Sequence, residues 1–113
     1  MKIRTLMLGS LIALLSGCIE VPSDNTAYVF ESKNSVQCES PGITKTESSQ
    51  KLIDIGVDVL ISECAYDNLI DVMDRCGNPT SEIIVHKIQL ENVSDAKSVG
   101  FYENPDFTPF DCE

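Results

Sequence analysis

Two hydrophobic periodicities alternate along residues 27–100, and they constrain the fold more than any other feature. Residues 82–90 have the strongest strand pattern, with Ile84, His86, Ile88 and Leu90 on one face and Ile83, Val85, Lys87 and Gln89 on the other. Residues 45–55 instead place apolar side chains at helical spacing. We therefore expect an α+β domain of two layers, with about three strands and two to three helices packed on the sheet.

Capping and turn residues set the other expected elements. Thr44 and Glu47 have the spacing of a capping box, which predicts the start of the helix over 45–55. Two further helices are predicted, one over 67–76 and a short one around Ala96. The segments expected to be extended are 27–31, 35–38, 57–64 and 82–90.

The first residues have the layout of a secretory signal. Lys2 and Arg4 precede an apolar run, residues 5–15. This run is shorter than the about 20 residues that a membrane-spanning helix needs. It ends in Leu15-Ser16-Gly17-Cys18, which resembles the lipobox of bacterial lipoproteins.

The resemblance implies where the protein is located. Residues 1–17 would be removed as a signal peptide, and Cys18 would carry a diacylglycerol thioether as the new N-terminus. Two or more acyl chains anchor a protein stably, at about 0.8 kcal/mol per buried methylene. Ile19 stands where inner-membrane retention favours Asp, so we expect an outer-membrane anchor that faces the periplasm. Residues 18–26 would form the lipidated tether of a single domain, 27–113.

The remaining chain is strongly acidic. Loss of Lys2 and Arg4 leaves 6 basic against 18 acidic residues, and the net charge changes from −10 to −12. Nucleic acid is excluded as a partner, because phosphate binding needs basic patches. The same charge excludes electrostatic attraction to anionic lipid, which leaves the lipid on Cys18 as the expected membrane contact.

Four cysteines remain for structural use, and an exported chain is expected to form two disulfides from them: Cys38, Cys64, Cys76 and Cys112. We favour Cys38–Cys64 with Cys76–Cys112, because Cys38 and Cys64 lie near the ends of strands that would be parallel and adjacent. Cys64–Cys76 with Cys38–Cys112 is the alternative. The chain has no Cys-x-x-Cys pair and no zinc-module spacing, so no metal or other cofactor is expected.

Ligand-site candidates gather at one expected strand-to-helix junction. Ser62, Tyr66 and Asp67 follow the strand over 57–64, and parallel sheets bind ligands at the carboxyl ends of their strands. His86 is the single histidine and could act there as a base, or it could simply be hydrogen-bonded in the core.

The C-terminal segment is the candidate partner surface. It is rich in aromatic side chains, at Phe101, Tyr102, Phe107 and Phe110. Aromatic residues with polar neighbours are common at interfaces, although these could equally cover the sheet.

The sequence contains no complete catalytic set. The function that we expect is that of a non-enzymatic, membrane-anchored envelope lipoprotein with a protein partner. The alternatives are a periplasmic protein that binds a small ligand or a cation and, less favoured, an enzyme built on His86 and a carboxylate.

Overall fold

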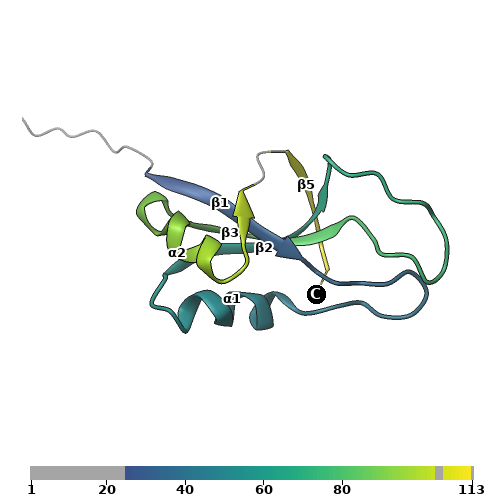
Figure 1. Ribbon diagram of the computed structural model, residues 1–113, viewed down its shortest axis with the longest axis horizontal. Coiled ribbons are helices and arrows are strands. Elements are labelled where there is room, and N and C mark those ends of the chain that lie inside the picture. Colours follow the sequence, from purple (N-terminus) through teal and green to yellow (C-terminus); the bar gives the residue numbers. More distant parts are fainter. Residues whose placement is uncertain (1–24, 104–105, 113) are drawn as a thin grey trace, which may run out of the picture.

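The computed structural model describes residues 25–103 and 106–112, so the expected signal peptide and Cys18 lie outside the described residues. Five antiparallel strands form one sheet in the order β4-β1-β3-β2-β5 (Figure 1). The strands are β1 (Thr26–Ser32), β2 (Val59–Asp67), β3 (Glu82–Gln89), β4 (Tyr102–Glu103) and β5 (Phe107–Phe110). The helices are α1 (Lys45–Ile53), the 3₁₀ turn η2 (Leu90–Asn92) and α2 (Val93–Ser98).

The central strand β3 is the strand predicted over 82–90. It is apolar on both faces because both faces are covered, and its buried residues are Ile83, Ile84, Val85, His86 and Ile88. It lies between β1 and β2, and its residues 83–88 are within the paired stretch of both neighbouring strands.

The helix predicted over 45–55 is confirmed as α1, with its capping box. Thr44 Oγ1 accepts a hydrogen bond from the Glu47 amide at 3.0 Å, and Glu47 Oε1 accepts one from the Thr44 amide at 2.9 Å. These bonds satisfy two amides that a helix start leaves without partners. Ser48 and Leu52 form the buried side of α1.

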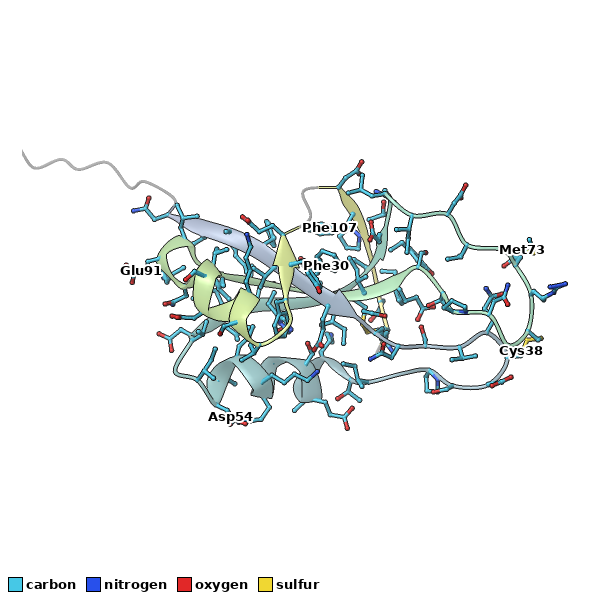
Figure 2. The ribbon with its side chains drawn as sticks, in the orientation of Figure 1. Phe30, Cys38, Asp54, Met73, Glu91 and Phe107 are labelled. Atoms are coloured by element: carbon cyan, nitrogen blue, oxygen red, sulfur yellow. A yellow bond between two sulfur atoms is a disulfide. The ribbon has the colours of Figure 1, made fainter. Side chains whose placement is uncertain are left out.

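The two faces of the sheet are covered differently. Leu52 of α1 and Ala96 of α2 belong to one apolar cluster with Val29 and Ile88 of the sheet, so both helices cover the same face. The opposite face has no helix among the described residues. There Phe30 and Phe107 pack over a smaller cluster formed by Ala65, Ile83 and Val85 (Figure 2).

The predicted fold class is wrong. The described residues form five strands and only two short helices, rather than about three strands under two to three helices. The expected helix over 67–76 does not form. β2 continues to Asp67, whose amide donates to Ser81 O, and β5 pairs with the last residues of β2. A helix of this length has marginal stability unless it buries an apolar face. Here Asp67, the first residue of the expected helix, is instead part of β2 and pairs with β5.

The favoured disulfide pairing is also wrong, and so is its alternative. The structure joins Cys38 to Cys76 and Cys64 to Cys112, which confirms two disulfides. β1 and β2 do run in the same direction, but β3 lies between them and separates the residues that follow β1 from β2. Cys38 therefore lies next to the connection between β2 and β3, which contains Cys76. Cys112 follows β5, the strand that pairs with β2 at Cys64.

Candidate functional site

His86 is fully buried between two serine hydroxyls. Its Nδ1 is 2.7 Å from Ser62 Oγ on β2, and its Nε2 is 2.8 Å from Ser48 Oγ on α1. The strand register pairs Ser62 with His86 on one face, and α1 brings Ser48 to the same face. Phe101 packs edge-on against the imidazole, with ring centroids 5.7 Å apart.

The hydrogen bonds continue from Ser48 to the surface, and this continuation determines which atom donates in each bond of the network. Ser48 Oγ donates to Glu31 Oε2 at 2.6 Å, and Lys51 Nζ donates to Glu31 Oε1 at 2.7 Å. Because a hydroxyl has one hydrogen, Ser48 must accept from Nε2–H of His86. Nδ1 then accepts from Ser62, and both nitrogens of a neutral imidazole are satisfied.

This network is suited to holding α1 on the sheet. Burial disfavours the imidazolium and lowers the pKa of His86 from 6.5 to about 4, so the ring is neutral near neutral pH. A fully buried ring cannot reach a substrate, and its direct polar neighbours are Ser48 and Ser62 rather than a carboxylate. The geometry therefore gives no support to a general base at His86.

Of the four residues predicted at a ligand site, the structure brings two together, Ser62 and His86. Tyr66 lies farther along β2 on their face and stacks on Phe110, with ring centroids 4.4 Å apart. Asp67 is buried and points to the opposite face, since successive side chains of a strand alternate. The prediction assumed parallel strands, and in an antiparallel sheet the carboxyl ends of neighbouring strands do not meet.

Most of the predicted aromatic surface is packed against the sheet. Phe101 is fully buried in the cluster between the helices and the sheet. Phe107 lies beside Phe30 on the other face, and Phe110 is half-buried at the sheet edge. Tyr102 alone among the four is mostly open, at 64% exposure. The C-terminal segment thus mainly covers the sheet, and Tyr102 is the part of it that a partner could reach.

The largest departure from ordinary burial is the 68–77 loop, the first part of the connection between β2 and β3. Four large apolar side chains are exposed on it, namely Leu69 (63%), Ile70 (50%), Val72 (38%) and Met73 (64%). Connections longer than about 12 residues without secondary structure are uncommon in compact domains and are often functional. Figure 2 shows Met73 and Cys38 at the tip of the domain, far from Glu91 at the other end.

The 68–77 loop is fixed in place by Gln37. Its Nε2 donates to the carbonyl oxygens of Met73 at 2.9 Å and Pro79 at 3.1 Å, and its Oε1 accepts from the Arg75 amide at 2.8 Å. The Gln37 backbone bonds the loop as well, and the Cys38–Cys76 disulfide follows directly. The apolar side chains are therefore presented by an ordered backbone.

The sequence pattern indicates neither the role of Gln37 nor the exposure of the 68–77 loop. Leu69, Ile70, Val72 and Met73 fit a helical spacing, which predicts a helix in place of the observed loop. No local signal separated the two outcomes, because Asp71 and Asp74 fall on the polar face of such a helix and Asn78-Pro79 lies beyond its expected end.

Comparison with known proteins gives no relative: no family model, curated protein or solved structure matches this chain. Within residues 25–103 and 106–112, no three His, Cys, Asp or Glu side chains are grouped so that they could hold a metal ion. The same residues contain no helix with the length and apolar character needed to cross a membrane.

Proposed function

We propose that this protein is a small, acidic, non-enzymatic lipoprotein of the bacterial envelope that binds a protein partner through its 68–77 loop. The observation that carries the proposal is the exposure of Leu69, Ile70, Val72 and Met73 on a loop that Gln37 and a disulfide hold in place. Several large apolar side chains exposed on one short segment are typical of an interaction site, and an ordered loop loses little entropy on binding.

The position of the loop favours a partner away from the anchoring membrane. β1 begins at one end of the sheet, and the 68–77 loop extends beyond the other end (Figure 1). A lipid on Cys18 would be attached through the residues that precede β1. The anchor would then join the domain at the end opposite the loop.

The charge of the loop favours a protein over a lipid surface. Asp71 and Asp74 lie next to the apolar residues and outnumber Arg75, the one cation of the loop, and the full sequence has a net charge of −10. Anionic headgroups would repel these carboxylates, whereas a protein groove with a basic rim would pair with them. The partner that fits is therefore an envelope protein with an apolar groove flanked by Lys or Arg.

The test places a photocrosslinking amino acid at Val72 in the lipidated protein in cells. Adduct formation with one protein is expected, and the double variant Leu69→Ser/Met73→Ser should abolish it. Ile53→Ser is the matched control, because Ile53 is a similarly exposed apolar residue on α1 at 51% exposure. Adducts that persist in the double variant, or that Ile53→Ser abolishes equally, would refute the proposed surface.

The anchor is tested separately. Labelled palmitate should incorporate into the protein, and Cys18→Ala should remove the label and release the protein from the envelope fraction. Unchanged fractionation of Cys18→Ala would refute the lipoprotein assignment, yet it would leave the loop as a binding surface open to the crosslinking test.

A further inference from the structure

A polar cleft of about 410 Å³ lies where the chain leaves β1 and enters β3, beside the 68–77 loop. Lys33 and Ser35 line it from the segment after β1, and Thr80 and Glu82 line it from the entry to β3. Phe110 of β5 supplies an apolar wall. Cavities that bind small molecules have volumes of about 300–1,000 Å³ and a few fixed polar groups within apolar walls.

One polar group in the cleft is a carboxylate that a closed set of hydrogen bonds holds in position. The Glu82 amide donates to Thr80 Oγ1 at 3.1 Å, and Ser35 Oγ donates to Glu82 Oε1 at 3.1 Å. The hydroxyls of Ser35 and Thr80 are also bonded, so Thr80 is the donor to Ser35. The other oxygen, Oε2, has no hydrogen-bond partner within the described part of the chain.

The second polar group is a buried ammonium. Lys33 is only 6% exposed, and its Nζ donates to the carbonyl of Pro41, which also lines the cleft. An ammonium has three hydrogens to donate, and no described carboxylate forms an ion pair with Lys33. Buried lysines are normally paired with an opposite charge, because burial of a lone charge is costly. Lys33 is thus placed to receive an anionic group from outside the chain.

We propose that this cleft binds a small zwitterion of the α-amino acid class. The ligand carboxylate pairs with Lys33, the ligand ammonium pairs with Oε2 of Glu82, and an apolar side chain lies against Phe110. Charge-assisted hydrogen bonds of this kind are about twice as strong as neutral ones. The cleft contains one cation and one anion, so a ligand with both charges is favoured over a simple anion, which Glu82 would repel. This inference is independent of the partner that binds the 68–77 loop.

The experiment is calorimetric titration of the full-length protein with the amino acids, followed by three matched probes: leucine, N-acetyl-leucine and leucinamide. Leucine is expected to bind saturably. N-acetyl-leucine lacks the ammonium and leucinamide lacks the carboxylate, so each should bind at least about tenfold more weakly. Amide shifts in nuclear magnetic resonance spectra should map leucine to Ser35, Val36, Thr80 and Glu82.

Two variants assign the charges. Lys33→Met should weaken leucine at least about tenfold, and Glu82→Gln should do the same while the Ser35 bond is kept. Lys33→Met should melt no lower than the wild type, because it removes an unpaired buried charge. Met73→Ser, in the 68–77 loop, should bind leucine normally. The proposal is overturned if no amino acid binds saturably, if the amide shifts map elsewhere, or if neither Lys33→Met nor Glu82→Gln weakens binding.

Discussion

The network around His86 and the 68–77 loop invert the usual distribution of polar and apolar residues. Beneath α1, His86 and Ser48 are buried and Ser62 is half-buried, and each imidazole nitrogen has a partner. At the tip of the domain, four large apolar side chains face solvent. The first region is ordered by complete hydrogen bonding inside the sheet, whereas the second is ordered from beneath by Gln37 and a disulfide.

The two regions should therefore respond to mutation in opposite ways. Changes in the His86 network act on the stability of the whole domain, because its members join β1, β2, β3 and α1. Changes to the exposed side chains of the 68–77 loop should leave folding intact and act on binding alone.

The largest effect is expected from His86→Ala. The substitution leaves a cavity in the core and removes the partner of two buried or half-buried hydroxyls, so the free energy of unfolding should fall by about 4 kcal/mol. Urea denaturation measures it. Lys87→Ala, on the same strand but half-exposed on the other face, is the matched control and should cost less than about 1 kcal/mol. Equal losses of unfolding free energy in His86→Ala and Lys87→Ala would show that the hydrogen-bond network of His86 has no special role in stability.

Acid should weaken the same network. The pKa of His86 is lowered to about 4 in the folded protein, while an unfolded histidine keeps a value near 6.5. The unfolded state therefore binds more protons between these values. The free energy of unfolding is fully retained above pH 6.5 and falls by up to about 3 kcal/mol as the pH is lowered to 4.

The matched measurement for this pH dependence is a second stability curve on His86→Gln. It keeps the titrating carboxylates and loses the histidine, so the difference between the curves isolates His86. Parallel curves for the two proteins between pH 6.5 and 4 would contradict the assignment.

Gln37→Ala should loosen the 68–77 loop while the sheet remains intact. The side chain makes three hydrogen bonds to backbone groups near the loop, and their loss should ease local opening by about 1–2 kcal/mol. Hydrogen exchange should then accelerate at the Arg75 amide and stay unchanged in β3. Gln50→Ala, which removes one exposed bond to Asp54 on α1, is the control and should leave Arg75 protected. Slow exchange at Arg75 in Gln37→Ala would show that the disulfide and the backbone bonds of residue 37 order the loop without the Gln37 side chain.

The smallest effect on stability is expected from Leu69→Ser/Met73→Ser. Both side chains are more than half exposed, at 63% and 64%, so the free energy of unfolding should change by less than about 0.5 kcal/mol. Thermal unfolding followed by circular dichroism gives the value. Leu52→Ser, in the core of the helix-covered face, provides the contrast and should be strongly destabilising. A large loss in the loop variant would mean that these side chains stabilise the fold.

Local chemistry made much of the secondary structure predictable. Thr44 and Glu47 bond to each other's amides within four residues of chain, so the start of α1 could be read directly. β3 could be predicted because Ile83, Ile84, Val85 and Ile88 are β-branched, and such residues favour extended backbone. The candidate site was less predictable from the sequence. Ser62 and His86 are both predicted site residues, but no sequence pattern indicates that Ser48 lies beside them.

The sequence by itself determined the start of α1, the central strand β3 and the presence of two disulfides, because each depends on near neighbours or on composition. Only the tertiary structure decided the strand order, the disulfide pairing and the conformation of residues 68–77. Insertion of β3 between β1 and β2 separates Cys38 from Cys64, and β2 continues through Asp67, the first residue of the expected helix, to pair with β5. These outcomes depend on contacts between residues far apart in the chain, which periodicity and capping patterns do not encode.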